Sequence, residues 1–182
     1  KVIVGGRNPK AGNLSTQTVK VEVTDAYDSS GRIQLIKNIY SGSTSSNPSG
    51  LTKFEDDLFF SAQNSKKGIE LWKSQGSKTT TSLLRDINPG KASSTPSGFS
   101  VFDNKLYFSA NDGETGVELW KTDGSSQGTK QVADIRPGSG SSSPSDLAVL
   151  DNKLLFGAND GNNGTELWRL SKGSDSPELV RN

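Results

Sequence analysis

The chain has 182 residues, of which 30% are hydrophobic and 23% are charged, and its formal net charge is +1. Because 21 basic and 20 acidic residues balance and neither sign forms a long run, we expect no nucleic-acid partner. No apolar stretch approaches the roughly 18 residues that a bilayer-spanning helix needs, so we also expect no membrane span. Cys and His are both absent, which excludes disulfides, His-based triads and most zinc or redox sites.

The first 26 residues differ from the rest of the chain. Val19, Val21 and Val23 alternate with polar residues, which is typical of a half-buried strand. Residues 11–25 resemble the last hairpin of a bacterial Ig-like or cadherin-like domain. That resemblance implies that residues 1–26 are the C-terminal hairpin of an adhesion-type domain, and we expect the chain to be an excerpt of a longer protein.

Residues 27–182 are predicted to be repeats. Glu-Leu-Trp occurs three times, and Trp72, Trp120 and Trp168 follow one another at a period of 48 residues, the difference between their positions. The same period, without a gap, aligns further apolar, glycine and proline positions. These columns are Pro48, Pro96 and Pro144; Phe60, Phe108 and Phe156; Ala62, Ala110 and Ala158; and Gly68, Gly116 and Gly164. We predict units at about 33–80, 81–128 and 129–176, with the next unit starting at 177–182.

Each unit is predicted to contain four short strands. In the middle unit they cover residues 99–102, 106–110, 117–121 and 130–135, with turns at 103–105 and 122–124. Four strands in roughly 40–50 residues are typical of a β-propeller blade. The predicted fold is therefore all-β: four-stranded blades of a β-propeller, three blades and the start of a fourth, in a partial ring. An open β-solenoid is the alternative that also satisfies the period.

The middle unit carries a family resemblance. Residues 118–125 read ELWKTDGS, residues 134–138 read DIRPG and residues 106–113 read LYFSANDG. Over residues 33–182 the chain resembles the bacterial repeat family named for the pattern Glu-Leu-Trp-x-x-Asp-Gly-Thr (ELWxxDGT). The resemblance implies large secreted or cell-surface proteins with propeller structure. The first and third units lack the Asp of the pattern, which argues against a fixed chemical role for Asp123.

The three tryptophans are the candidate ligand-binding residues. Exposed Trp72, Trp120 and Trp168 would stack on sugar rings, as in a lectin-like propeller. The competing interpretation, which we favour, is that one tryptophan per unit packs inside the fold, because a Trp in a fixed strand column is what repeat packing requires. The neighbouring glutamates, such as Glu118, are interpreted as forming a repeated structural hydrogen bond or pairing with a nearby Lys or Arg.

Asp112 and Asp160 are the candidate metal ligands. Each lies in an Asn-Asp-Gly loop, and calcium favours clustered oxygen ligands. The first unit has lysines at the matching positions, and the spacing differs from known calcium loops, so plain turn chemistry is the interpretation we favour. Calcium is the one cofactor considered; no other is predicted.

No residues are predicted to be catalytic. Carboxylate pairs of the glycosidase type remain possible in principle, but several acidic residues recur with the repeat, whereas a catalytic site usually breaks such symmetry. We therefore predict a non-catalytic structural or adhesion protein, extracellular or at the cell surface. The alternative is a carbohydrate- or calcium-binding propeller. The expected partners are further repeats of the parent chain or other copies of itself, and glycans under the alternative.

Overall fold

The computed structural model describes residues 33–180, and within that range every regular element is a β-strand. The predicted hairpin at 1–26 lies outside the described residues. Over residues 33–180 there is no helix with the length and apolarity needed to cross a bilayer.

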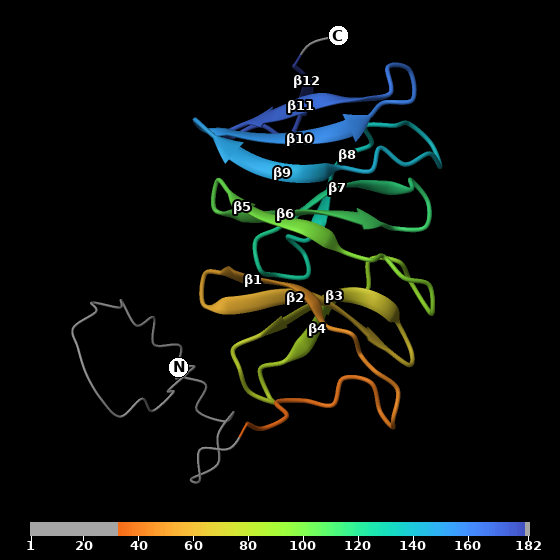
Figure 1. Ribbon diagram of the computed structural model, residues 1–182, viewed down its shortest axis with the longest axis vertical. Coiled ribbons are helices and arrows are strands. Elements are labelled where there is room, and N and C mark those ends of the chain that lie inside the picture. The colour runs from red at the N-terminus through yellow and green to blue at the C-terminus, as the bar shows by residue number, and fades with distance from the viewer. Residues whose placement is uncertain (1–32, 181–182) are drawn as a thin grey trace, which may run out of the picture.

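Twelve strands form three four-stranded antiparallel sheets. The first sheet contains β1 (Ser49–Phe54), β2 (Asp57–Asn64), β3 (Gly68–Ser74) and β4 (Ser82–Arg85). The second sheet contains β5 (Ser97–Phe102), β6 (Lys105–Asn111), β7 (Val117–Thr122) and β8 (Lys130–Ala133). The third sheet contains β9 (Ser145–Leu150), β10 (Lys153–Asn159), β11 (Thr165–Ser171) and β12 (Glu178–Leu179). In each sheet, strands that follow one another in the chain pair with one another, and the three sheets are stacked along the long axis (Figure 1).

Each predicted unit ends before the fourth strand of its sheet, because β4 begins at Ser82, β8 at Lys130 and β12 at Glu178. Residues 177–182 were expected to open a fourth unit, but Glu178 and Leu179 pair with Arg169 and Trp168 of β11 as the last strand of the third sheet. A sequence period has no intrinsic starting point, and only strand pairing decides which residues share a sheet. The confirmed part of the fold prediction is an all-β chain of repeated four-stranded sheets.

The tight turn between β5 and β6 lies at the predicted residues. Asp103 and Asn104 have φ values of 47° and 53°, and Asp151 and Asn152 repeat this with 44° and 60°. Two consecutive residues with positive φ are the requirement of a type I′ hairpin turn, and Asn and Asp tolerate that region best.

Both faces of the middle sheet are buried against its neighbours. We call the face of each sheet that points toward the next sheet its forward face, and the opposite one its rear face. Forward residues of the first sheet pack against rear residues of the second sheet, and the second sheet repeats this on the third. The first core contains Phe54, Phe59 and Leu71 against Leu106, Phe108, Ala110 and Trp120. The second contains Phe102, Tyr107 and Leu119 against Leu154, Phe156, Ala158 and Leu170.

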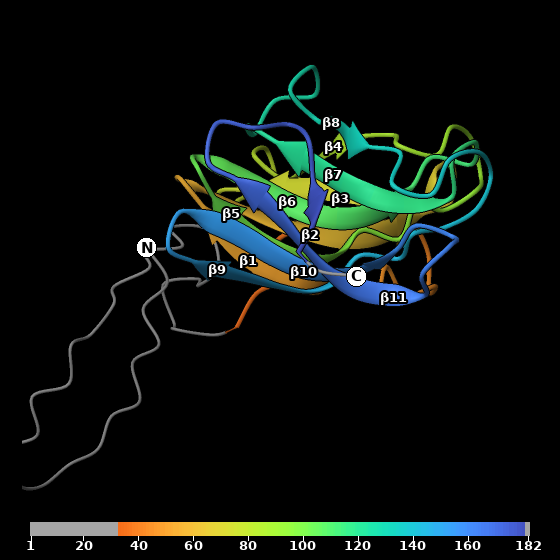
Figure 2. The same cartoon turned by 90° about the horizontal axis from the view of Figure 1, so that it is seen from above.

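The first strands of the three sheets lie next to one another. β1 contacts β5, and β5 contacts β9. Seen from above, β1, β5 and β9 lie on one side of the stack, while β4 and β8 lie on the other (Figure 2). A Cβ atom on Gly50, whose φ is +66°, would lie 2.7 Å from the ring of Phe99. The glycine therefore permits the close approach of β1 and β5.

Candidate functional site

The tryptophans lie mainly inside the stack. Trp72 and Trp120 are only 6% and 5% exposed, and each contributes to an apolar cluster. Neither indole N–H finds an acceptor among the described residues. Trp168 is half-buried and donates its Nε1 hydrogen to the carbonyl of Ala158 at 3.0 Å. These positions favour packing over sugar stacking for Trp72 and Trp120, because stacking needs an open ring face.

Asp112 organises its own loop. Its Oδ1 accepts hydrogen bonds from the backbone N–H groups of Glu114 and Thr115 at 2.9 and 2.8 Å, and from the Thr115 hydroxyl. Partial burial raises the pKa of Asp112, but these hydrogen bonds outweigh it and the pKa falls below its ordinary value. This is the geometry of an Asx turn.

Asp160 repeats this arrangement in the third sheet. Its Oδ1 accepts hydrogen bonds from the N–H groups of Asn162 and Asn163 at 2.8 and 2.9 Å. The bond from the Asn163 N–H, followed by that from Asn162, lowers the pKa of Asp160. Asp112 and Asp160 lie in separate loops, and residues 33–180 contain no group of three or more Asp or Glu residues that could hold a metal ion. Calcium binding by these loops stays a prediction.

A buried glutamate lies at each joint, by which we mean the interface between one sheet and the next together with the segment that connects them. Glu70, on β3, is 0% exposed. Its carboxylate accepts hydrogen bonds from the N–H of Ile87 at 2.8 Å, the N–H of Ser94 at 2.9 Å and the hydroxyl of Ser94 at 2.6 Å. Both donors belong to the segment that connects the first sheet to the second. Burial raises the pKa of Glu70 above its ordinary value, and these hydrogen bonds offset only part of the effect.

The same arrangement of hydrogen bonds recurs 48 residues later, in the second sheet. Glu118, also 0% exposed, accepts hydrogen bonds from the N–H of Ile135 at 3.0 Å, the N–H of Ser142 at 2.8 Å and the hydroxyl of Ser142 at 2.6 Å. The separations along the chain are again 17 and 24 residues. Of the two sequence interpretations of this glutamate, the repeated structural hydrogen bond is confirmed for Glu70 and Glu118.

The serine in turn connects to the next sheet. The carbonyl of Ser94 accepts a hydrogen bond from the N–H of Asn111 on β6 at 3.0 Å, and that of Ser142 from Asn159 on β10 at 2.9 Å. Each buried carboxylate thus orders a connecting segment whose backbone binds the following sheet. The sequence contains this signal as a second pair of columns, Glu70 with Ser94 and Glu118 with Ser142, but spacing alone does not say that they touch.

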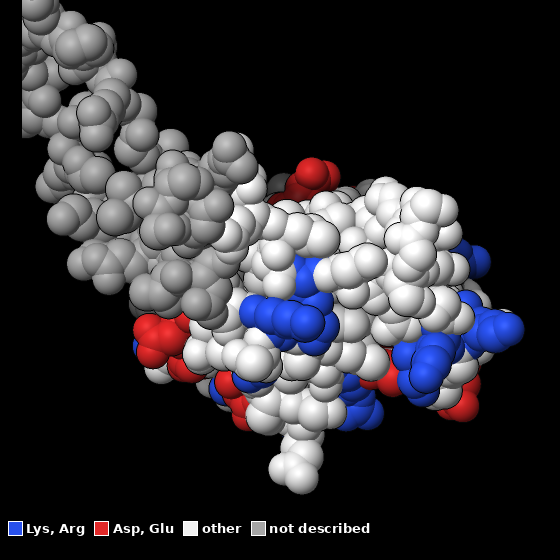
Figure 3. Space-filling view, turned by 90° about the horizontal axis from the view of Figure 1, so that it is seen from below, with Lys and Arg blue, Asp and Glu red and all other residues white. Residues whose placement is uncertain are grey.

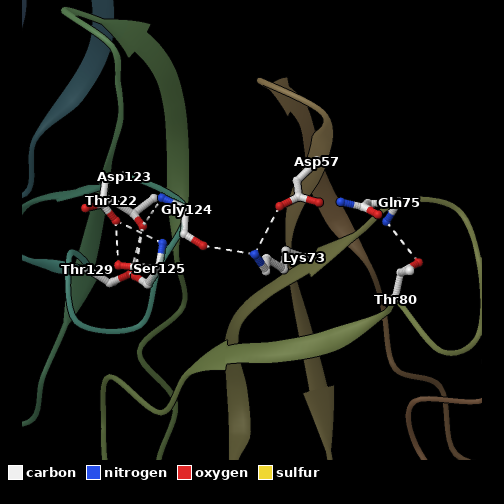
Figure 4. Close-up of polar contacts among 9 residues, drawn as sticks. All are labelled: Asp57, Lys73, Gln75, Thr80, Thr122, Asp123, Gly124, Ser125 and Thr129. Atoms are coloured by element: carbon white, nitrogen blue, oxygen red, sulfur yellow. Dashed lines mark hydrogen bonds and ion pairs between the residues drawn. The ribbon is translucent and has the colours of Figure 1, made fainter.

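A lysine on the third strand reaches the last turn of the next sheet. Lys73 donates through Nζ to the carboxylate of Asp57 at 3.0 Å and to the carbonyl of Gly124 at 3.0 Å (Figure 4). Gly124 lies in the turn between β7 and β8, so this contact joins the first sheet to the second. One period later, Lys121 pairs with Asp175, in the turn between β11 and β12.

The turn between β7 and β8 also explains the Asp of the repeat motif. Asp123 Oδ1 accepts hydrogen bonds from the N–H and hydroxyl of Ser125 at 2.9 and 2.7 Å. The side-chain bond, then the backbone bond, lowers the pKa of Asp123. At the base of the same turn, the hydroxyls of Thr122 and Thr129 form a hydrogen bond with one another at 2.8 Å (Figure 4). The role of Asp123 is to shape the turn.

The forward face of the third sheet is uncovered. Its residues Leu150 and Leu167 are 58% and 49% exposed. The equivalent residues of the second sheet, Phe102 and Leu119, are 5% and 0% exposed, because the third sheet covers them. Exposed apolar side chains in columns that are otherwise buried indicate a surface suited to a further contact.

The opposite end of the stack is the rear face of the first sheet. Here Ile39 packs against the cluster of Phe60, Ala62 and Trp72. Ile36 and Ile39, with Leu58 and Phe60, line an apolar cavity of about 260 Å³. Seen from this end, the described surface is mostly uncharged, and both basic and acidic side chains lie at separate places on it (Figure 3).

Comparison with known proteins yields little. No family model matches the chain, and no curated protein sequence matches it. The crystal structure of the computationally designed protein Ika8 is similar over 72% of this chain, with 20% identity and a TM-score of 0.40. The match covers 34% of the designed protein, so this chain spans about a third of its length.

Proposed function

We propose that this chain is a non-catalytic structural or adhesion repeat module, extracellular or at the cell surface, whose sheets are blades of a β-propeller. The observation that carries the proposal is the forward face of the third sheet. The residues that are covered in the first two sheets are exposed there, so this face is suited to bind a further sheet.

The occupant of that face is a further sheet of the same repeat type. Two joints within the chain already show the contact it would make, forward apolar residues against Leu, Phe, Ala and Trp of a rear face. The partner is a further repeat of a longer parent chain or another copy of this one. Such head-to-tail contacts form a ring if the rotation closes and a filament if it does not.

Three features support the propeller form of this stack. Every sheet is a four-stranded meander, the first strands lie side by side, and each sheet is covered on the face that meets its neighbour. The resemblance of residues 33–182 to a family of secreted and surface repeats supports the extracellular location. The buried carboxylates Glu70 and Glu118 are each occupied by three hydrogen bonds, which favours a structural role over a catalytic one.

The test is the molar mass of the chain in solution, measured by light scattering over a range of concentrations. We expect self-association that the double variant Leu150→Asp, Leu167→Asp abolishes. Val101→Asp is the matched control, because Val101 is 44% exposed but lies on the second sheet. A wild-type chain that stays monomeric at high concentration, with its apolar face open to solvent, would contradict the proposal.

The alternative of carbohydrate or calcium binding is tested separately. A glycan array and a calcium titration of the same chain measure the two ligands directly. Absence of binding to both would eliminate the alternative and leave the structural role.

A further inference from the structure

A polar cavity lies between the second and third sheets. Its volume is about 390 Å³, within the range of small-molecule sites. Its floor is one cross-strand row, in which Tyr107 of β6 pairs with Lys121 of β7 and Lys121 pairs with Lys130 of β8. Lys105 lies two residues before Tyr107 on the same face and also lines the cavity. The roof is the turn between β11 and β12, with Asp175.

The repeat is broken at this cavity. In the first sheet the positions of Lys105, Tyr107 and Lys130 are occupied by Asp57, Phe59 and Ser82. There, Lys73 bonds to Asp57 and to the Gly124 carbonyl, and Gly124 lies against Phe59. The first joint is thus closed by its own side chains. In the second sheet Lys105 replaces Asp57 and the phenol of Tyr107 replaces the ring of Phe59, so the same position becomes polar.

The turn over the cavity also departs from the repeat. The hydroxyl pair that closes the other two turns, Ser74 with Thr81 and Thr122 with Thr129, is replaced by Leu170 and Pro177. Leu170 is packed in the core instead. The third turn is instead held over the second sheet by a hydrogen bond from the Gly173 N–H to the Asp103 carboxylate at 2.9 Å. This places Ser174 and Asp175 at the mouth of the cavity.

The carboxylates of the cavity are already engaged, whereas two of its cations are not. Asp175 pairs with Lys121, and Asp123 is occupied by Ser125 of its own turn. The ammonium groups of Lys105 and Lys130 form no hydrogen bond or ion pair with any residue in 33–180. Both line the same cavity as Ser174 and Asp175 of the roof. The cavity therefore has two cations that form no hydrogen bond or ion pair with the described residues, a phenol, and carboxylates with unused lone pairs.

From this arrangement we propose that the cavity binds a small polyol that carries one carboxylate, the chemistry of an acidic monosaccharide. The ligand carboxylate lies between the ammonium groups of Lys105 and Lys130, which form charge-assisted hydrogen bonds with it. The ligand hydroxyls bond to the Tyr107 phenol, the Gln127 amide and the free lone pairs of the aspartates. A dianion such as phosphate fits less well, since the three lysines of the site are balanced by Asp103, Asp123 and Asp175. The site does not depend on the proposed self-association of the sheets.

The experiment is an NMR titration of the intact chain with glucuronate, glucose, acetate and inorganic phosphate as separate probes. We expect saturable shifts with glucuronate that centre on the backbone amides of Ser174 and Asp175, and weaker binding of the other three. Lys105→Gln and Lys130→Gln should each weaken glucuronate binding about tenfold, the loss expected for one charge-assisted hydrogen bond. Lys153→Gln is the matched control, since Lys153 occupies the column of Lys105 in the third sheet.

The results separate clearly. Selective glucuronate binding that is lost in the two cavity variants and kept in Lys153→Gln supports the site. No saturable shift with glucuronate overturns it, as does equal weakening by the control variant. Phosphate or acetate binding as tight as glucuronate binding overturns the acidic-sugar assignment. Unchanged amide spectra of the variants away from the cavity establish that each variant is folded.

Discussion

The hydroxyl of Ser94 donates a hydrogen bond to the carboxylate of Glu70 at 2.6 Å, although 24 residues separate the two along the chain. The same serine offers its carbonyl to Asn111 of the next sheet. One buried carboxylate therefore replaces the water that would otherwise solvate the connecting segment, and it does so where the chain leaves one sheet for the next. Buried polar groups are tolerated only when they are paired in this way.

Glu118→Ala should destabilise the chain strongly. The substitution leaves the N–H groups of Ile135 and Ser142 buried without an acceptor, and each such group costs about 1–3 kcal/mol. We expect a loss of about 3 kcal/mol in the free energy of unfolding, measured by urea denaturation. Glu166→Ala is the control, because Glu166 is half-buried and its carboxylate accepts no hydrogen bond from any residue in 33–180. Equal losses for the two variants would contradict the structural role of the glutamate.

Tyr107 should make stability fall at high pH. Burial, with the nearby carboxylates of Asp175 and Asp103, raises the pKa of Tyr107 to about 12, against 10.0 ordinarily. Between these values the unfolded chain loses the phenol proton while the folded chain keeps it. This contribution is therefore complete below pH 10 and is lost as the pH rises toward 12.

Urea unfolding at a series of pH values, compared between the wild type and Tyr107→Phe, measures this effect. The free energy of unfolding of the wild type, relative to that of Tyr107→Phe, should fall by up to about 2 kcal/mol between pH 10 and pH 12. This is the free energy that corresponds to a pKa shift of this size. Asp175→Asn should reduce the shift. A stability difference that does not change with pH would show that the Tyr107 phenol titrates normally.

Gly116→Ala should cost more stability than Gly164→Ala. Both glycines have a φ of +77°, so the backbone strain of an alanine is the same at the two positions. A Cβ atom at Gly116 would lie 2.6 Å from the carbonyl oxygen of Gly140, whereas at Gly164 it meets open space. We expect an additional loss of about 2 kcal/mol at Gly116, in the range of overpacking costs, measured by thermal or urea unfolding. Equal effects would mean that conformation alone explains this glycine column.

Thr95→Asn should stabilise the chain. Thr95 has a φ of 48° immediately before Pro96, and this region is costly for a β-branched residue. Asn tolerates positive φ better, occupies the same column at Asn47, and fits because Thr95 is exposed. We expect a gain of about 1 kcal/mol in the free energy of unfolding. Ser143→Thr, in the same column, should have the opposite sign, and a loss in Thr95→Asn would refute the strain argument.

The candidate site shows where sequence reasoning stops. The three tryptophans and the two Asn-Asp-Gly loops were visible because they repeat, and repetition is a property of packing and turns. The cavity beside Tyr107 is formed where repetition fails, at Lys105, Tyr107 and Lys130. These substitutions can be read in the sequence, but their common row depends on the pairing of β6, β7 and β8.

By itself the sequence determined the 48-residue period, the four strands of each unit and the hairpin turns at Asn104 and Asn152. These are local properties, set by short runs of apolar residues and by residues that accept positive φ. Only the tertiary structure decided that residues 178–179 complete the third sheet, that Glu70 meets Ser94, and that Leu150 and Leu167 lie uncovered. Those outcomes depend on contacts between distant segments, whose geometry is set when whole sheets pack face to face.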